Sequence, residues 1–479
     1  MTTSTPDSAT TVTELLEQWL GARRWYAGKG RAPRLRSRGV LAWPSAGGAA
    51  GEDAVRVESH LVTDESGPEP VLYHVPLTLR ADPVEALHTA LVGTVGEGGQ
   101  RRYVYDGCQD QVYVQALLDT VHDGREVPAA SGQEAPSAAG HPVGQPAPRP
   151  EVTRAAVLTG EQSNTSVIVE TASGPRIVKV FRVLHPGDNP DVAVQAALAE
   201  GGSQLVPQPM GYLQGRWPAP DGHGVETGHL AFAQEFLPGV QDAWRTALEA
   251  AREDRDFTDA ALTLGEATAG IHAQLRAAFG STAATDEVKQ QLLARMRRRL
   301  AAALEAAPQL AEQAAAVESL YDRAAEGRWP SLQRIHGDYH LGQVLDVPGR
   351  GWVVVDFEGE PLRPLAERTA PDLVLRDVAG MLRSLDYAAG SVGQEHDLER
   401  SGWKQRCRAA FLEGYAAGGT SDDPGEYALL LAALEVDKAL YEVVYEARNR
   451  PAWMPIPLAA VSRLLARHGA PAGTPAGTP

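Results

Sequence analysis

Residues 331–361 read SLQRIHGDYHLGQVLDVPGRGWVVVDFEGEP, and the predicted architecture of the chain follows from them. They contain two acidic centres: Asp338 in the pattern His-Gly-Asp, and Asp356 directly after the apolar run from Trp352 to Val355. A β-branched run that ends in an acid is typical of a strand that delivers a carboxylate, whereas His-Gly-Asp is typical of a tight loop. We therefore expect the two carboxylates to be brought together.

Two carboxylates with a nearby amide suit phosphoryl transfer. One orients and deprotonates the attacking hydroxyl, and the other, with an amide oxygen, holds the Mg²⁺ that bridges the nucleotide phosphates. Gln343, after Asp338, supplies the amide, and the order base, amide, strand, metal-binding acid is that of protein kinases. Either acid alone is more often a solvated loop residue or a helix cap. Together they favour a kinase with Asp338 as base and with Gln343 and Asp356 as metal ligands.

HGDYHLGQVL and the following DFEGEPLRPLAERTAPDLVLRDVAGMLRSLDYAA resemble the aminoglycoside-phosphotransferase-like kinases and, within them, the actinobacterial maltokinases. The resemblance extends to RRWYAGKGR near the N-terminus and to DKALYEVVYEARNRPAWMPIPL near the C-terminus, so it covers nearly the whole chain. It implies an α+β, bilobal protein-kinase-like (aminoglycoside phosphotransferase-like) fold with an N-terminal cap subdomain. Arg23, Trp25 and Lys29 of the cap would be structural.

The composition is that of a globular protein with more than one domain. The chain has 479 residues, of which 43% are hydrophobic and 22% are charged, and this length predicts two or three domains. The formal net charge of -17 argues against nucleic acid as a partner, because phosphate contacts need clustered Lys and Arg. The basic run Arg295 to Arg299 favours a solvated helix face, with a docking patch as the alternative. Two distant cysteines and the lack of a membrane-length apolar run favour a cytoplasmic protein, which we expect to be a monomer.

Shifts of composition along the chain predict five segments. Residues 124–150 are rich in Pro, Ala, Gly and Ser without apolar periodicity, which predicts a linker or disordered insertion. Alternating runs from 38 to 118 predict an antiparallel sheet before this linker, and long amphipathic patterns after residue 257 predict helices. The segments are a cap subdomain at 1–123, the linker at 124–150, a nucleotide-binding lobe at 151–243, a helical C-lobe with the catalytic loop and sugar site at 244–468, and a disordered tail at 469–479.

Three strands are predicted within residues 152–182, at the start of the nucleotide-binding lobe. The loop between the first two is rich in small and polar residues suited to capping phosphates, although by itself it would be a plain β-turn. Lys179 alternates with apolar neighbours in the third strand, where a lysine commonly clamps the α- and β-phosphates. The residues expected to bind the nucleotide phosphates are Gly160, Ser163, Asn164, Thr165 and Lys179.

The acidic partner of Lys179 is expected on a helix at 191–200. Ala193 stands where the resemblance places an acid, and Glu200 is the alternative within the helix. A predicted strand at 229–244 then leads into the hinge between the lobes. Backbone groups there, including those of Gln234 and Phe236, should bind adenine, because a buried purine edge needs one donor and one acceptor.

Lys438, Tyr441 and Tyr445 fall at i, i+3 and i+7 and share one helical face. A stripe of aromatic residues is more often part of a core. Likeness to maltokinases implies instead that these residues bind the sugar, together with Asp338 and His340. The same likeness implies that the helix beginning near Arg376 and Asp377 braces the catalytic loop, whereas His272 is expected in the core.

The resemblance implies an ATP-dependent maltokinase that needs Mg²⁺ and phosphorylates the anomeric hydroxyl of maltose, giving maltose 1-phosphate for α-glucan or glycogen synthesis. The nearest alternative is a glucosamine or other aminosugar kinase, whose acceptor would favour acidic contacts such as Glu442 and Glu446 over Lys438. A further alternative is a non-catalytic nucleotide-binding scaffold, for example for trehalose synthase. The presence of Asp338, Gln343, Asp356 and Lys179 weighs against the scaffold.

Overall fold

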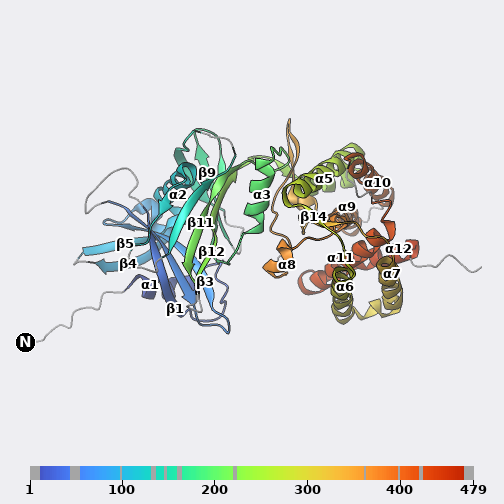
Figure 1. Cartoon of the computed structure of the whole chain (residues 1–479), viewed down its shortest axis with the longest axis horizontal. Coiled ribbons are helices and arrows are strands. Elements are labelled where there is room, and N and C mark those ends of the chain that lie inside the picture. Colours follow the sequence, from blue (N-terminus) through green and yellow to red (C-terminus); the bar gives the residue numbers. More distant parts are fainter. Residues whose placement is uncertain are drawn as a thin grey trace, which may run out of the picture. The chain divides into compact units, whose positions relative to one another are not determined.

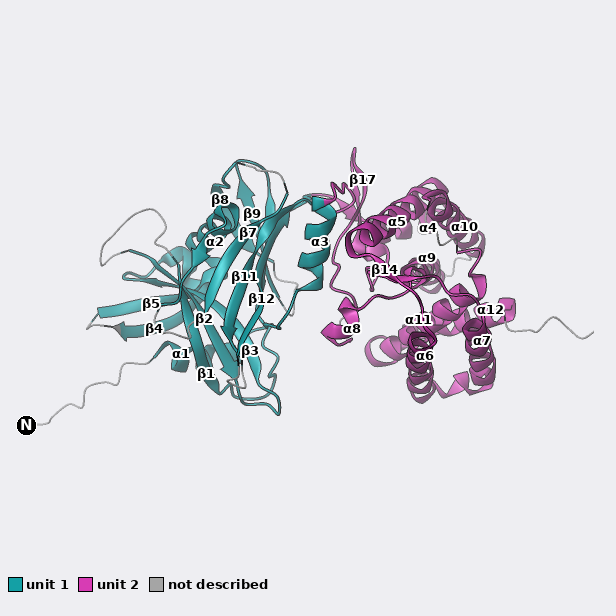
Figure 2. Ribbon diagram, viewed as in Figure 1, with its two compact units in different colours: residues 1–200, 207–238 teal, residues 201–206, 239–479 magenta. Residues whose placement is uncertain are grey.

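The computed structural model of the chain divides into two compact units, residues 1–200 with 207–238 and residues 201–206 with 239–479 (Figure 2). Strands dominate the first unit and helices dominate the second (Figure 1), in agreement with the predicted α+β class. The tail predicted at 469–479 lies outside the described residues. Those residues are 11–43, 54–97, 100–130, 136–144, 148–158, 164–219, 224–360, 363–396, 400–419 and 424–468.

The first unit begins with helix α1 (Val12–Leu20), which starts in a capping box. The Thr11 hydroxyl accepts from the Glu14 amide, and the Glu14 carboxylate accepts from the Thr11 amide at 2.7 Å, so two amides of the first turn find partners. An antiparallel sheet follows, in which the described strands have the order β1-β2-β3-β5-β4. Its elements are β1 (Leu35–Ala42), β2 (Arg56–Asp64), β3 (Val71–Arg80), η1 (Glu85–Ala90), β4 (Leu91–Glu97), β5 (Gln100–Asp106), η2 (Gly107–Gln109) and, after the sheet, α2 (Gln111–Asp123).

A second sheet in the same unit has the order β6-β7-β11-β12-β10-β9-β8 over its described strands. The three strands predicted within 152–182 are β8, β9 and β10, which confirms that part of the prediction. Helix α3 follows β10 in the chain. The bounds are β6 (Glu126–Val127), β7 (Ser137–Pro142), β8 (Val152–Val157), β9 (Asn164–Thr171), β10 (Arg176–Phe181), α3 (Pro190–Glu200), β11 (Pro209–Pro218) and β12 (Val225–Glu235).

Part of the stretch predicted as a linker belongs to this sheet. Strand β7 pairs with β6 on one side and with β11 on the other. A side chain at Gly140 in β7 would place its Cβ 2.1 Å from the carbonyl oxygen of Thr120 in α2, so only glycine lets the strand approach the helix this closely. The prediction of a linker at 124–150 is therefore wrong for β6 and β7. Small residues that resemble low complexity are needed there for close packing.

The predicted cap and nucleotide-binding lobe share one hydrophobic core. Leu41 of the cap and Val180 of the lobe belong to the same cluster of buried side chains. A buried ion pair also joins the two parts, since Arg182 donates to Asp106 at 2.9 Å. The boundary predicted between 123 and 151 does not separate compact bodies. The second unit includes residues 201–206, and its main part begins at 239 rather than 244.

The second unit is built mainly of helices. Its hairpin of β16 (Val344–Val347) and β17 (Gly351–Val354) lies in sequence between the two acidic centres, and helix α11 packs against α6, α7, α9 and α12. No helix in the described ranges is both long and apolar enough to cross a membrane. The remaining bounds are β13 (Gln241–Asp242), α4 (Ala243–Glu253), α5 (Thr258–Phe279), β14 (Ser281–Thr282), α6 (Asp286–Ala306), η3 (Pro308–Gln313), α7 (Ala314–Glu326), β15 (Leu332–Gln333), η4 (Leu341–Gln343), α8 (Leu365–Thr369), α9 (Val374–His396), α10 (Ser401–Ala417), α11 (Ala428–Asn449), η5 (Pro451–Trp453) and α12 (Pro455–His468).

Candidate active site

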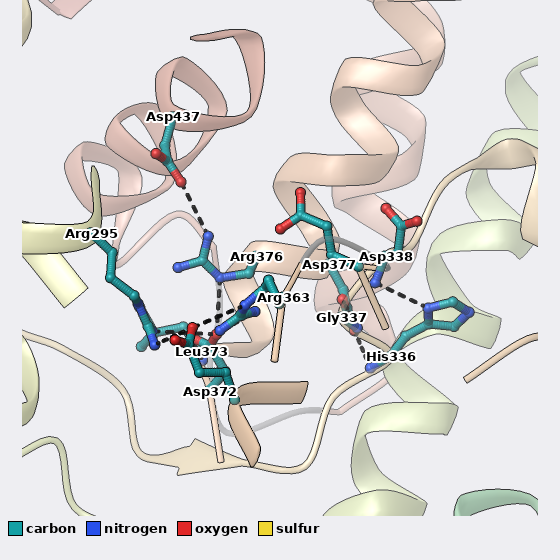
Figure 3. A network of polar contacts seen from close by, with 12 residues as sticks. Arg295, His336, Gly337, Asp338, Arg363, Asp372, Leu373, Arg376, Asp377 and Asp437 are labelled. Carbon is teal, nitrogen blue, oxygen red and sulfur yellow. Dashed lines mark hydrogen bonds and ion pairs between the residues drawn. The ribbon is translucent and has the colours of Figure 1, made fainter. Parts of the chain in front are cut away.

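A buried carboxylate holds the turn that carries Asp338. Asp377, in the first turn of α9, accepts the amides of His336 at 2.8 Å and of Gly337 at 2.9 Å (Figure 3). The same carboxylate lies 3.0 Å from Nε2 of the buried His272. Gly337 has a φ of +86°, a left-handed conformation that favours glycine. The expected bracing role of α9 is confirmed by these hydrogen bonds, and so is the core position of His272.

The Lys438 ammonium, from α11, lies beside the Asp338 carboxylate. Nζ is 3.1 Å from Oδ1 of Asp338 and 3.9 Å from Oε1 of Glu360. Burial raises the pKa of Asp338, but the charges of Lys438 and His340 outweigh burial, so that the pKa is lowered. Burial lowers the pKa of Lys438, and Asp338 and Glu360 reverse this, so that the pKa is raised. Asp338 is therefore ionised at neutral pH, as a group that accepts a hydroxyl proton must be.

The two residues predicted as metal ligands lie together. Nε2 of Gln343 donates to Oδ2 of Asp356 at 3.0 Å, and the Val355 amide donates to the Gln343 carbonyl at 3.0 Å across the hairpin. The side-chain hydrogen bond uses an amide hydrogen and leaves the amide oxygen of Gln343 as a ligand. Amide and carboxylate oxygens are the ligands that Mg²⁺ prefers, so this pair fits the metal that a kinase requires.

Asp356 has a φ of +66°, which is rare for a residue with a side chain. The left-handed region costs about 1–2 kcal/mol for such a residue, and outliers of this kind cluster at active sites. The His336 ring lies 3.0 Å from the carbonyl oxygen of Val355, which ties the Asp338 turn to the end of β17. His340 interacts electrostatically with both Asp338 and Asp356, although burial is the main cause that lowers the His340 pKa. The two acidic centres are thus brought together, as the sequence predicts.

Lys179 is paired with Asp191, a residue that sequence reasoning missed. Nζ of Lys179 lies 2.8 Å from Oδ2 of Asp191, whose side chain is inaccessible to solvent. The other oxygen of Asp191 accepts from Gln195 at 2.7 Å. Ala193 has no carboxylate, and Glu200 is exposed at the far end of α3. The available signal was an acid in the first turn of the helix, two residues before the expected position, where it resembles an ordinary dipole-compensating residue.

The predicted phosphate loop is described only at its end. Gly160 and Ser163 lie outside the described residues. Asn164 begins β9, and Thr165 is buried with its hydroxyl accepting from Nε of Arg182 at 2.8 Å. Thr165 therefore has a structural partner in the interior of the first unit, and the phosphate contacts of this loop stay a prediction.

The predicted adenine contacts lie at the end of β12. Gln234 is buried within the strand. The amide of Phe236 donates to the Pro175 carbonyl at 3.2 Å, and that of Glu235 donates to the Gln208 carbonyl at 2.8 Å. Both amides have partners inside the first unit, and adenine binding by this segment stays a prediction.

A small pocket opens at Asp338 in the second unit, and its charged lining residues are balanced in sign. The ring of Tyr441 lies beside it, with Nζ of Lys438 4.8 Å from the ring centroid. Tyr445, farther along α11, has 44% of its surface exposed and is approached by Arg450 at 5.8 Å. The charged lining residues are Asp338, Glu360, Asp377, Arg299, Arg376 and Lys438.

Two arginines of the basic run in α6 belong to ion pairs near this pocket. Arg299 donates to Asp437 at 2.9 Å, and Arg376 donates to the same carboxylate at 3.2 Å. Arg295 lies 3.9 Å from Asp372. Figure 3 shows Arg376 pointing to Asp437, and Arg295 near Asp372. The prediction of a solvated face is wrong for Arg295 and Arg299, because the helix turns them toward buried carboxylates.

The other two acids on this part of α11 already have partners in the chain. Glu442 accepts from Arg383 at 2.5 Å. Glu446 accepts from Arg450 at 2.6 Å and from the Tyr387 hydroxyl. Burial raises the pKa of Glu442 even though Arg383 opposes the rise. Both carboxylates are therefore occupied by ion pairs and hydrogen bonds within the second unit.

The second unit carries Asp338 on a braced turn and an amide–carboxylate pair after a hairpin, and the first unit carries a lysine–acid pair. These are the side chains that a kinase-type phosphotransferase needs. Comparison with known families agrees. A model described as "Phosphotransferase enzyme family" matches residues 154–430, and the chain belongs to this family. A model of the maltokinase N-terminal cap domain matches residues 19–110, as the resemblance of the N-terminal region implies.

Relatives of similar size carry another substrate in their names. A glucosamine kinase of Streptacidiphilus jiangxiensis is 32% identical over 339 residues, which cover 65% of this chain and 75% of the relative. A glucosamine kinase of Mycolicibacterium smegmatis is 32% identical over 332 residues, which cover 64% and 79%. A solved structure, "Glucosamine kinase in complex with glucosamine, ADP and inorganic phosphate", has a TM-score of 0.67 at 24% identity and covers 95% of this chain and 99% of that chain. This likeness confirms the predicted fold.

Proposed function

We propose that the protein is an ATP-dependent kinase of maltose, which it converts to maltose 1-phosphate. The observation that carries the choice of a neutral sugar is the pairing of Lys438 with both Asp338 and Glu360 at the pocket. A neutral sugar needs hydroxyl partners and brings no charge. The pocket already balances its carboxylates with cations of the chain, and the match to a maltokinase cap supports the same acceptor.

The chemistry follows from the residues of each unit. Asp338 accepts the proton of the anomeric hydroxyl while that oxygen bonds to the γ-phosphorus of ATP, and the bond from phosphorus to ADP breaks. Lys179, held by Asp191, binds ATP phosphates in the way that a point charge does. A Mg²⁺ ion held by Gln343 and Asp356 would neutralise phosphate charge. Lys438, Tyr441, Tyr445 and His340 would contact the sugar.

The cellular setting is part of the same proposal. The resemblance to maltokinases supports a cytoplasmic monomer that supplies maltose 1-phosphate for α-glucan or glycogen synthesis. Trehalose synthase is then the candidate protein partner.

An aminosugar kinase is the second candidate, because the relatives at 32% identity are named glucosamine kinases. A sugar ammonium would have to share Asp338 or Glu360 with Lys438, at a like-charge cost. Glu442 and Glu446, the acids considered for such contacts, are bound by Arg383 and Arg450. The local charges thus favour a neutral acceptor.

The test is release of ADP from Mg·ATP with maltose, glucosamine, glucose or no sugar, using Asp338→Asn as the control. Turnover on maltose that disappears in the variant supports the proposal. The product should also lose its reducing end, because the anomeric oxygen becomes phosphorylated. ADP release with glucosamine alone would make glucosamine the substrate and leave the proposed mechanism unchanged. No ADP release with any sugar would favour a non-catalytic nucleotide-binding scaffold.

A further inference from the structure

Glu360 bridges two cations at the edge of the pocket. Its Oε2 lies 3.3 Å from Nη2 of Arg299, and its Oε1 lies 3.9 Å from Nζ of Lys438. The residue is only 5% exposed. Cations therefore stand close to both oxygens of this buried carboxylate, as the burial of a charged group requires. Glu360 is therefore fixed in place, and its charge attracts the Lys438 ammonium.

Arg299 is fixed in its turn from two other directions. Its Nη1 donates to Oδ2 of Asp437 at 2.9 Å, and its guanidinium lies 5.2 Å from the ring centroid of Tyr441. Asp437 directly precedes Lys438 on α11, so that the arginine connects α6 to the same helix turn that carries the ammonium. Because Arg299 is held by these contacts, the Glu360 carboxylate that it binds has little freedom to move.

These contacts place the Lys438 ammonium between two carboxylates that interact with it in different ways. Asp338 is 3.1 Å away, within hydrogen-bond range, whereas Glu360 at 3.9 Å acts through its charge. Without Glu360, the Lys438 ammonium would move closer to the Asp338 carboxylate. Asp338 must keep an oxygen available for the hydroxyl of the acceptor. A small displacement of a catalytic group is enough to slow a reaction strongly.

We propose that Glu360 is a positioning residue for phosphoryl transfer, which holds the Lys438 ammonium at the distance from Asp338 that leaves the base available. The proposal rests on the proposed function in one respect, namely that Asp338 is the base. Arg299 holds the Glu360 carboxylate in place and is therefore a second positioning residue. Glu360 itself acts through Lys438.

The kinetic test compares Glu360→Gln and Glu360→Asp with Glu318→Gln. Glu318 also pairs with an arginine of the basic run, Arg297 at 2.9 Å, but on the exposed side. With the acceptor that the wild type uses, Glu360→Gln should lower kcat by about 10²-fold, with a much smaller change in the KM for the sugar. Glu360→Asp should recover part of kcat, and Glu318→Gln should behave as the wild type.

The pH profile separates positioning from simple loss of structure. Losing the Glu360 charge makes Asp338 easier to ionise, and a closer Lys438 does the same, so the acid limb of kcat/KM should move to lower pH in Glu360→Gln. An unchanged kcat and acid limb would overturn the proposal. A defect confined to the KM for the sugar would overturn it too, because Glu360 would then be a binding residue.

A second measurement does not depend on any acceptor. The chain has five lysines, so selective ¹³C labelling of lysine gives few signals, and Lys438→Arg assigns that of Lys438. Glu360 is among the charges that raise the Lys438 pKa. In an Asp338→Asn background, where no carboxylate at this position can draw Lys438 closer, the titration midpoint of Lys438 should fall when Glu360→Gln is added and stay when Glu318→Gln is added. An unchanged midpoint would refute the proposal that Glu360 acts on Lys438, whatever the enzyme phosphorylates. A wild type that phosphorylated no sugar would instead refute the proposed function alone.

Discussion

Oδ1 of Asp338 and Nζ of Lys438 lie 3.1 Å apart although 100 residues separate them in the chain. One residue stands on a turn braced by α9 and the other on the long helix α11. The pair therefore depends on the packing of α9 against α11, which is among the larger helix contacts of the second unit. The position of Lys438 relative to Asp338 is coupled in this way to the assembly of the helical core.

Asp338→Asn should reduce turnover by about 10²–10⁴-fold, the usual contribution of a general base. The amide cannot take the hydroxyl proton, while its shape preserves the turn. Stability should change little compared with this loss. ADP release checks the rate, and Asp346→Asn, an exposed acid on β16, is the matched control. Equal loss in both variants would contradict the assignment of the base.

Lys438→Met should move the acid limb of the pH–rate profile to higher pH. In the wild type the Asp338 pKa is lowered below 3.8, so the stability from this shift is present above about pH 4 and is lost as the pH falls through the folded-state pKa. Without the ammonium, burial raises the Asp338 pKa with less opposition. Rate and urea unfolding should be measured from about pH 2.5 to pH 8, a range that includes the lowered pKa of the wild type, with Lys289→Met on α6 as the control. A limb that stays in place would refute this coupling.

Asp191→Asn should weaken ATP binding and destabilise the first unit by about 3 kcal/mol, because it breaks an ion pair whose carboxylate is fully buried. The KM for ATP should rise more than the KM for the sugar. Glu200→Gln, at the exposed end of the same helix, should leave both constants unchanged. If Glu200→Gln has the larger effect, the partner of Lys179 in the working enzyme is not Asp191.

Asp377→Ala should lower the free energy of unfolding by about 2–5 kcal/mol, since the amides of His336 and Gly337 lose their acceptor and each buried orphan costs roughly 1–3 kcal/mol. Asp377→Asn keeps one acceptor oxygen and should cost less. Urea unfolding followed by fluorescence distinguishes the two. Equal stability of both variants and the wild type would mean that the turn needs no brace.

The sequence was informative where chemistry requires adjacent residues in a fixed order. The turn with Asp338, the amide of Gln343 and the strand before Asp356 were predictable because each lies within one short stretch. The helical face with Lys438 followed from periodicity, but its 3.1 Å contact with Asp338 depends on tertiary packing that no local pattern records.

Predictions failed where one residue type serves two purposes. Asp191 in the first turn of α3 looks the same whether it caps a helix or binds Lys179. Gly140 looks the same in a linker and in a strand pressed against a helix. Arg299 was interpreted as surface because its partners, Asp437 and Glu360, are distant in sequence. In each case the deciding contact comes from another element.

The left-handed backbone at Asp356 has a consequence for the history of such chains. Glycine would relieve the conformational strain at this position, so Asp356→Gly is expected to gain stability as it removes the carboxylate. A lineage that had abandoned catalysis would have no reason to resist that exchange. Under the proposed role of Asp356 as a metal ligand, the residue at this one position reports whether selection still acts on phosphoryl transfer. A descendant with glycine here would be the first candidate for a protein that has lost this activity.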